Sequence, residues 1–421
     1  MKWLLSVLLL IASSGYVFAD GVIRDGQGAR STGRGGVNLA FFDTGLTILD
    51  NPAGMSNINA TQLTDFGFDV LFTDLDYQDP QNPQTSPSNS PIPVGHFAFV
   101  KKTRDPRFTI GVGGFSVAGF SSKYQLEPVA PFAGTQTYKA VGLLGKALGA
   151  LSFAATDRLS IGANFGVAVN HMELEGPYFL QGPSPFRGTP TLLDLQATGA
   201  EITWATGLQY HLLPTTTVGV RYQSQSSFRL DGNSLITIDG LGTSRFDTEF
   251  NIVWPQSFGF GLRHEFNRSS VFGFDVEWRD WSSAFDQFGV RLTNPDNPIF
   301  ANVIGSELLE EFPLNWRDVF SFRFGWERHV SVDRTVRAGY VFHRNPIPDS
   351  TLTPFIQATL EHAFSVGMTQ RIGSCEFDCA YQFSTGRDRS VATSDFIGGD
   401  FDQSRISTSA HWASVGVIKR F

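Results

Sequence analysis

Most of the chain after about residue 60 alternates between apolar and polar positions with a period of two. In the stretch 320–327, phenylalanine or tryptophan alternates with serine, arginine, glycine or glutamate. The same alternation runs through 159–170, 272–279 and 336–342. Because successive side chains of a β-strand point to opposite faces, this period predicts strands with one apolar and one polar face.

About fourteen such segments follow one another, and the links between them differ in length. Neighbouring antiparallel strands need only tight turns, so we predict that the short links lie at one end of the sheet and the long ones at the other. The predicted tight turns are 154–157, 212–214, 266–268, 330–332 and 371–373, and the predicted long loops include 78–92, 176–191, 293–315 and 387–405. The predicted strands are 61–77, 93–102, 106–120, 136–153, 157–175, 192–211, 215–231, 246–265, 269–292, 316–329, 333–344, 358–370, 373–386 and 406–421.

The composition places these strands in a membrane. Only 17% of the residues are charged, against about 25% in soluble domains, and 13% are aromatic. Beyond the N-terminus no apolar run approaches the length of a membrane helix. A soluble β-sandwich also alternates, but its turns recur at shorter intervals than many of these segments allow. The pattern therefore predicts an all-β fold, a transmembrane antiparallel β-barrel of about fourteen strands.

The N-terminus has the features of an export signal. Lys2 supplies a positive charge, residues 4–12 an apolar core, and residues 17–19 a cleavage site of the small-x-small type. We therefore predict that residues 1–19 are a signal peptide and that the exported chain starts at Asp20. Loss of Lys2 changes the net charge from −8 to −9, which argues against nucleic acid as a partner.

A glycine-rich stretch, 33–55, departs from the period of two. Apolar residues at 39, 42, 46 and 49 are spaced by three or four positions, which predicts one or two short helices. Asn51-Pro52 is suited to cap and start a helix, or to form a tight turn. A compact segment before a long series of strands favours a hatch that plugs the barrel lumen over residues 20–60, with the barrel formed by 61–421; an N-terminal arm packed on the surface is the alternative. The residues assigned to the hatch are Gly35, Gly36, Asp50, Asn51, Pro52 and Ala53.

The third predicted strand, 106–120, contains a break in its alternation. Apolar side chains occupy positions 108, 110 and 112, and then 115 and 117, so the phase slips by one residue. We predict a β-bulge at Gly113, Gly114 and Phe115, because one extra residue reverses the facing of the strand and leaves backbone groups unpaired. Such a defect is costly in lipid. Two interpretations stay open: a gap in the wall beside the hatch, and a harmless bulge near the rim.

Polar residues give no sign of a catalytic or metal site. The eight histidines are scattered without an HExxH motif, and Gly114–Ala118 falls short of G-x-S-x-G. Cys375 and Cys379 would lie about 13 Å apart on one strand, beyond disulfide reach. We therefore expect no enzyme activity, metal or cofactor. The charged residues on polar strand faces are expected either to pair across neighbouring strands or to anchor the hatch or bind a carboxylate: Asp275, Glu277, Arg279, Arg323, Glu327 and Arg337.

Several short motifs occur in a fixed order along the chain. They are Gly33-Arg34-Gly35-Gly36, Asp50-Asn51-Pro52-Ala53-Gly54-Met55, Trp254-Pro255 with Phe258–Leu262, Trp281-Ser282-Ser283, Trp316-Arg317-Asp318, Arg337–Tyr340 and Asn345–Asp349. This ordered set resembles the outer-membrane long-chain fatty acid and hydrocarbon transporters of the FadL/TodX type, over essentially the whole exported chain. The resemblance implies a fourteen-stranded barrel plugged by its N-terminal segment. It also implies a kinked third strand that opens sideways beside the hatch.

The expected function is diffusive uptake of hydrophobic molecules across the outer membrane of a Gram-negative cell. Long external loops would capture the cargo, and the gap beside the hatch would release it sideways. The alternatives are a general porin for small polar solutes and a surface receptor or adhesin. Further expected partners are outer-membrane lipid, lipopolysaccharide and the barrel assembly machinery, which would meet the terminal Phe421, and the chain is expected to be a monomer. The candidate cargo-binding residues are Phe179, Leu180, Phe186, Phe300, Ile304 and Leu308.

Overall fold

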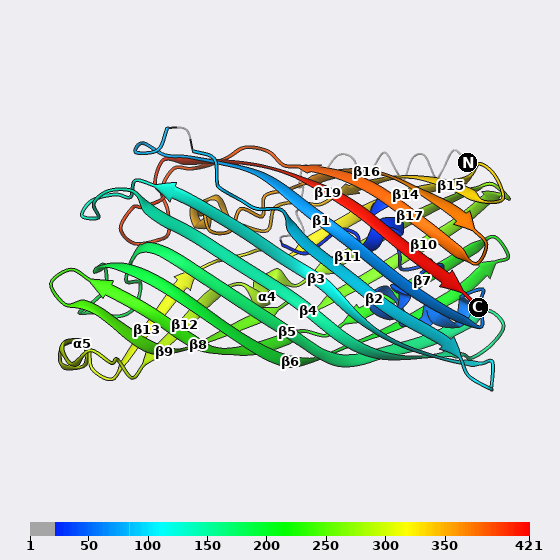
Figure 1. The fold of residues 1–421 in the computed structure, drawn as a ribbon, viewed down its shortest axis with the longest axis horizontal. Helices are drawn as coiled ribbons and strands as arrows, with labels where there is room; N and C mark the ends of the chain where they lie inside the picture. Colours follow the sequence, from blue (N-terminus) through cyan, green and yellow to red (C-terminus); the bar gives the residue numbers. More distant parts are fainter. Residues whose placement is uncertain (1–21, 84) are drawn as a thin grey trace.

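Each strand pairs with its neighbour in antiparallel fashion, and the last strand pairs back with the first. In this computed structural model, which describes residues 22–83 and 85–421, β19 (Ser404–Arg420) pairs with β1 (Gln62–Gln78) from Leu63↔Arg420 to Gln78↔Arg405. The sheet therefore closes into a barrel (Figure 1). The predicted signal peptide, residues 1–19, lies outside the described residues.

The chain runs along the barrel wall fourteen times, once for each of the fourteen predicted segments. Four crossings consist of two consecutive strands separated by a short break: β7 with β8, β9 with β10, β11 with β12, and β13 with β14. The remaining strands are β2 (Ile92–Lys102), β3 (Phe108–Leu126), β4 (Gln136–Ala154), β5 (Leu159–Phe179), β6 (Pro190–Leu213), β7 (Thr216–Gln223), β8 (Ser226–Ile238), β9 (Gly242–Trp254), β10 (Ser257–Asn267), β11 (Ser270–Arg279), β12 (Gln287–Thr293), β13 (Glu307–Pro313), β14 (Val319–His329), β15 (Arg334–Phe342), β16 (His362–Ile372), β17 (Cys375–Thr385) and β18 (Arg389–Val391). The helices are α2 (Gly28–Gly33), α3 (Thr47–Asp50), α4 (Trp281–Ala284) and α5 (Pro298–Val303), with 3-10 turns η1 (Pro52–Asn57) and η2 (Asp349–Thr351).

The predicted arrangement of links is confirmed. Six links of two to five residues lie at the end that holds the C-terminus, and the long loops lie at the other end (Figure 1). One link at the long-loop end, 239–241, is also short. Strands β5 and β6 run further than expected, so the predicted loop 176–191 shrinks to 180–189.

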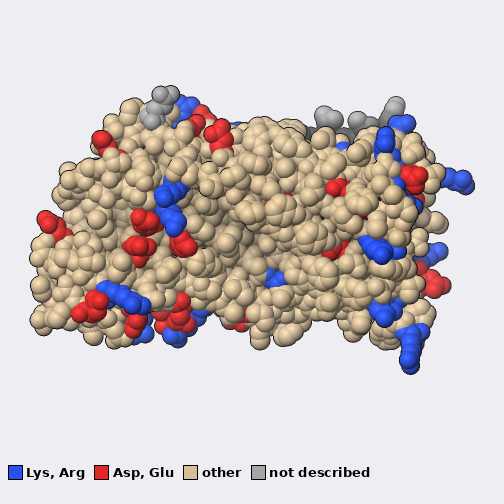
Figure 2. Space-filling view, in the orientation of Figure 1, with Lys and Arg blue, Asp and Glu red and all other residues tan. Residues whose placement is uncertain are grey.

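The apolar strand faces point outward around the middle of the barrel. Phe320, Phe324 and Trp326 of β14 are exposed, whereas Arg323 and Glu327 are buried inside. Figure 2 shows few charged side chains over the middle of the visible surface and more of them towards both ends. This is the lipid-facing belt of a membrane barrel. None of the described helices is long and apolar enough to span a bilayer.

Towards the long loops the facing is inverted. On β9, Phe246 and Phe250 are buried inside while Asp247 and Asn251 are exposed outside, whereas Phe258 of β10 is exposed in the belt. The wall therefore projects beyond the bilayer, and its interior there is an apolar core rather than a polar lumen.

The segment before β1 lies within the barrel and contains short helices (Figure 1). The capping prediction is confirmed: Asn51 accepts a hydrogen bond from the Ala53 N–H at 3.2 Å and Pro52 starts η1. The helical spacing at 39–49 is only partly realised, because α3 covers Thr47–Asp50 and the earlier apolar residues lie in a loop. They instead pack against the inner wall.

The bulge in β3 lies at Val117, three residues beyond the predicted slip. Ser116 pairs with Gly145 and Ala118 with the adjacent Leu144, so Val117 is the extra residue. The predicted bulge at Gly113, Gly114 and Phe115 is wrong, because these residues pair regularly with both neighbours. Phe115 faces inward in ordinary alternation and belongs to the same buried apolar cluster as the hatch side chains Ile48 and Met55. An apolar residue is therefore found at this inward position because the hatch lies next to it, and not because the strand reverses its facing.

Candidate functional site

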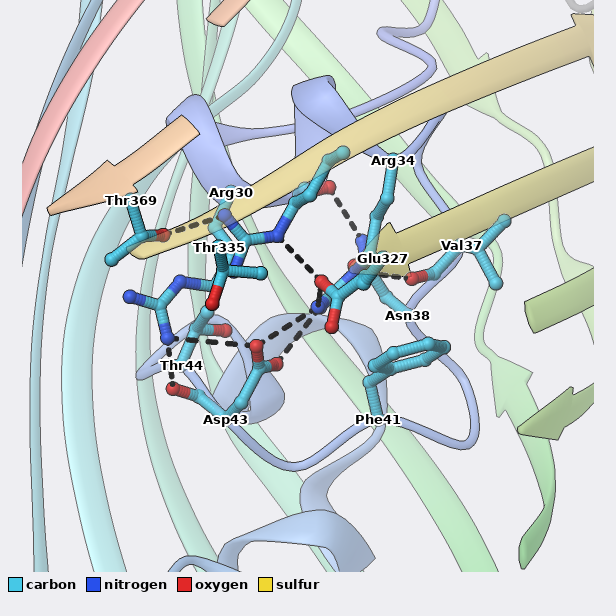
Figure 3. A network of polar contacts seen from close by, with 12 residues as sticks. Arg30, Arg34, Val37, Asn38, Phe41, Asp43, Thr44, Glu327, Thr335 and Thr369 are labelled. Carbon is cyan, nitrogen blue, oxygen red and sulfur yellow. Dashed lines mark hydrogen bonds and ion pairs between the residues drawn. The ribbon is translucent and has the colours of Figure 1, made fainter. Parts of the chain in front are cut away.

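A buried arginine joins the hatch to the barrel wall. The Arg34 guanidinium lies 2.9 Å from Asp43 within the hatch and 3.1 Å from Glu327 on β14, and it donates a 2.7 Å hydrogen bond to the Val37 carbonyl (Figure 3). Arg34 also stacks over the Phe41 ring, with 4.0 Å to the centroid. Burial alone would raise the pKa of Asp43. The guanidinium groups of Arg34 and Arg30 outweigh this effect and hold the pKa of Asp43 well below its usual range.

A second arginine fixes α2 to a neighbouring part of the wall. Arg30 is buried and lies 2.9 Å from both Glu376 and Asp378 on β17. The hatch backbone comes equally close: Gly35 has a positive φ of 69°, and a Cβ on Gly339 of β15 would lie 2.1 Å from the Gly35 nitrogen. A side chain at either position would push the hatch away from the wall.

The inward charges both pair with one another and hold the hatch. Arg323 of β14 lies 3.0 Å from Glu277 of β11, which is the cross-strand pairing expected from the sequence, whereas Arg279 lies 3.1 Å from Glu277 on the same strand. Asp275, in contrast, accepts hydrogen bonds from the backbone N–H groups of Asn38 and Leu39, at 2.7 and 3.0 Å. One wall face therefore serves as a ladder and as an anchor for the plug.

The Asn-Pro motif anchors the other side of the hatch. Asn51 is fully buried and donates from its side-chain nitrogen to the carbonyls of Leu39 and Leu208, at 2.7 and 3.2 Å. A Cβ on Gly207 of β6 would lie 2.0 Å from the Asn51 side-chain oxygen. The close packing of Asn51 against the wall therefore requires a glycine at position 207. Asp50, the end of α3, lines a polar central cavity of about 110 Å³ above the hatch.

The wall is incomplete between β2 and β3. Their pairing ends at His96↔Phe115, yet β3 continues to Leu126 and β1 to Gln78. Over this span the described residues show no β2–β3 ladder, and β2 itself begins only at Ile92. The bulge at Val117 lies immediately beyond the last rung. The loop that precedes β2 rejoins β3 higher up, where the Ser88 N–H donates to the Lys123 carbonyl at 2.9 Å.

The N-terminal arm, residues 22–27, lies behind this opening. Ile23 forms a β-bridge with Ala118, and the Gln27 side chain donates to the Ser116 carbonyl. Arg24 lies 3.0 Å from the buried Asp69 of β1 and stacks over Trp412 at 4.2 Å. The arm therefore touches β1, β3 and β19 on the inner side of the gap.

An apolar cavity of about 100 Å³ lies in the long-loop half of the barrel. Nearly all of its surface is formed by apolar groups, and its lining includes Tyr178, Phe250, Phe285, Phe288, Phe312 and Phe355. A second cavity, also about 100 Å³, lies beside the opening and is lined by 22–25, Leu71 and Leu75 of β1, and 119–122 of β3. Phe120 and Phe355 line both cavities. We call the first of these cavities the apolar cavity and the second the side cavity.

The predicted cargo-binding residues are brought to the long-loop end but do not line the apolar cavity. They belong to the packed core of the loops, where the Phe179 ring lies 5.3 Å from Phe132 and the Phe300 ring 5.9 Å from Phe246. Phe300 lies in α5. The residues concerned are Phe179, Leu180, Phe186, Phe300, Ile304 and Leu308, and their role in binding stays a prediction.

Sequence reasoning missed the residues that line the apolar cavity. Phe288 and Phe312 face each other across β12 and β13, and Phe355 comes from the loop 343–361. The inverted alternation at 246–252 was the available signal, because apolar residues there alternate with charged ones outside any lipid belt.

The sequence matches, over residues 10–421, the family described as outer membrane protein transport protein (OMPP1/FadL/TodX). The chain belongs to this family. It is therefore an outer-membrane β-barrel of a transport family, and the expected localisation is confirmed. Within residues 22–83 and 85–421, no group of three or more histidine, cysteine or acidic side chains is arranged to hold a metal ion.

Solved structures with the same fold include two toluene transporters and a FadL homologue. The Pseudomonas putida toluene transporter TodX superposes with a TM-score of 0.79 at 20% identity, covering 94% of this chain and 99% of that one. The Ralstonia pickettii toluene transporter TbuX gives 0.74 at 19% identity, with 94% and 99% covered. A Pseudomonas aeruginosa FadL homologue gives 0.74 at 16% identity, with 96% and 100% covered. No curated protein matches the sequence.

Proposed function

We propose that this member of the family takes up compact, neutral hydrophobic molecules and releases them sideways into the outer membrane. The observation that carries the proposal is the end of the β2–β3 ladder at His96↔Phe115. The opening above it borders the side cavity, which shares Phe120 and Phe355 with the apolar cavity. A molecule held among the aromatic rings would thus have a short path to lipid through the side cavity.

The size of the apolar cavity favours a small cargo. Its volume is about 100 Å³, below the roughly 150 Å³ of an engineered cavity that binds benzene. A single aromatic ring would fit after modest side-chain rearrangement, whereas a long acyl chain would extend into the side cavity. The toluene transporters TodX and TbuX share this fold, which supports the same class of cargo.

The binding would be weak, as transport requires. Burying about 150–250 Å² of an aromatic ring at about 25 cal/mol per Å² contributes roughly 4–6 kcal/mol. This corresponds to a dissociation constant between about 1 mM and a few tens of micromolar, before ordering costs. The movement would be diffusive, down the concentration gradient of the cargo, with the arm 22–27 shifting as the molecule leaves.

The opposite reading, a channel for polar solutes, is not favoured. The hatch occupies the lumen through buried ion pairs at Arg30 and Arg34, and the central cavity above it holds only about 110 Å³. We infer no catalytic role. The proposed surroundings are outer-membrane lipid and lipopolysaccharide around a monomer, with Phe421 exposed at the C-terminus for the assembly machinery.

Filling the apolar cavity tests the proposal. Ala140 lines the cavity from β4 and is buried, so Ala140→Phe should abolish uptake of radiolabelled toluene above the background of cells without the protein. Ala200→Phe is the matched control, because Ala200 is exposed on the outer face of β6. Heat-modifiable gel mobility would check that both variants fold. Wild-type uptake by folded Ala140→Phe would overturn the assigned path.

A further inference from the structure

A second discontinuity in the wall lies between β4 and β5. Their last rung is Lys139↔Glu175. Beyond it β5 stays with β6 as far as Phe179↔Pro190, and β4 stays with β3 as far as Leu126↔Gln136. The described residues 136–138 and 176–179 therefore flank a split without a ladder across it. Pro177 has no N–H to donate to a partner on either side.

A pocket of about 360 Å³ opens at this split on the outside of the barrel. Gln136 and Thr137 of β4 line one edge, and Gly176 and Pro177 of β5 line the other. The Lys139–Glu173 ion pair, 2.5 Å across, lies just below. The Phe132 and Phe179 rings, 5.3 Å apart, meet where β5 ends. We call this outer pocket the side window.

The side window and the apolar cavity share part of their lining. Gly176, Pro177 and Leu193 line both, so the two spaces are separated by the thickness of one strand. Gly176 makes the partition thin: a Cβ there would lie 2.8 Å from the Phe355 ring inside and 3.4 Å from the Thr137 carbonyl at the edge. Phe355, in turn, borders the side cavity next to the β2–β3 opening.

We propose that the side window is the inlet through which cargo reaches the apolar cavity from outside the cell. This inference rests on the proposed function and adds the uptake step to it. The path then runs from one wall opening to another: side window, apolar cavity, side cavity and the gap beside β2. It passes above the hatch, so the cargo never crosses the charged network around Arg30 and Arg34.

The charges at the side window select neutral cargo. Glu175 and Asp194 line the pocket, and no lysine or arginine does so among the described residues. Because the nearby Lys139 is already paired with Glu173, a carboxylate or phosphate approaching this mouth would meet net like charge, whereas an uncharged hydrocarbon would not. Leu192, Leu193 and Leu235 offer the apolar surface that it would contact.

Reversible blocking of the window tests the inlet. In a background with Cys375→Ser and Cys379→Ser, Thr137→Cys would be modified from outside with a bulky methanethiosulfonate reagent. Uptake of radiolabelled toluene should fall to the background of cells without the protein and return on reduction. Asn251→Cys, exposed on the outer face of β9, is the matched control, and its modification should leave uptake unchanged.

A second pair of variants covers the case in which the cysteine protein folds poorly. Gly176→Leu should block the passage between the side window and the apolar cavity and therefore lower uptake. Gly289→Leu should leave uptake unchanged, since a Cβ on Gly289 meets nothing within 4 Å. Fully modified Thr137→Cys or folded Gly176→Leu with wild-type uptake would overturn the inlet. If Ala140→Phe still abolished uptake, the proposed function would stand; if wild-type protein gave no uptake above background, both would fall.

Discussion

Single buried charges decide where the hatch lies. Arg34 contacts carboxylates of both the hatch and the wall, and Asp275 accepts two hatch N–H groups. The sequence placed Asp275 and Glu327 on the inner face, because alternation fixes facing. It left their partners open, since a hatch arginine and a strand carboxylate lie hundreds of residues apart and no local pattern couples them.

The Arg34 contacts predict a loosened hatch when the charge is removed. Arg34→Leu leaves Asp43 and Glu327 without one of their partners in a buried site, which costs about 3–5 kcal/mol. Hydrogen exchange should therefore accelerate across 28–57 while the barrel strands stay protected. Arg107→Leu is the control, because its ion pair with Asp105 is exposed to solvent in a tight turn and contributes little to stability. Unchanged exchange in Arg34→Leu would contradict the anchoring role.

At the scale of elements, strands could be predicted and their irregularities could not. Each of the fourteen crossings contains a segment predicted from alternation, because lipid outside and polar groups inside impose this pattern in the belt. Strand β13 was not predicted, since it lies within the predicted loop 293–315. The β3 bulge was misplaced because Phe115 is an inward apolar residue that contacts the hatch, and a one-dimensional pattern cannot distinguish hatch contact from lipid contact. The β2–β3 ladder ends at His96↔Phe115 although β2 continues to Ile92 beside β1, and no local pattern in either strand signals this separation.

The loop 386–403 offers a prediction about pH. Asp400 is buried and accepts hydrogen bonds from the Tyr138 hydroxyl at 2.9 and 3.1 Å. Burial raises the pKa of Asp400 from 3.8 to about 6. Since the pKa in the folded loop is the higher one, packing favours the protonated acid: its stabilisation is complete below pH 3.8 and is lost as the pH rises through about 6.

This linkage predicts faster cleavage of the loop 386–403 by an external protease at about pH 7.5 than at about pH 5. Asp400→Asn keeps an oxygen to accept from Tyr138 and has no charge to bury, so it should remove most of the pH dependence. Cleavage in the loop 294–306, measured on the same samples, corrects for the protease's own pH response. An Asp400→Asn loop as pH-sensitive as the wild type would exclude Asp400 as the titrating group.

For the whole molecule, the barrel separates two tasks. The half nearer the short turns is closed by a hatch pinned with buried ion pairs, and the half nearer the long loops holds aromatic cavities behind an incomplete wall. In the proposed path, hydrophobic cargo is thereby kept away from the polar lumen and led to the bilayer.

Deleting Val117 tests the central claim, sideways release, most directly. Ser116 and Ala118 already pair with consecutive residues of β4, so the deletion removes the bulge without shifting that register and allows β3 to continue its ladder along β2. Gly114→Val is the control, because a Cβ there meets nothing within 4 Å. With folded protein in the outer membrane, we expect toluene uptake to fall to background in the deletion variant and to stay at the wild-type level in Gly114→Val. Wild-type uptake by the deletion variant would contradict the account.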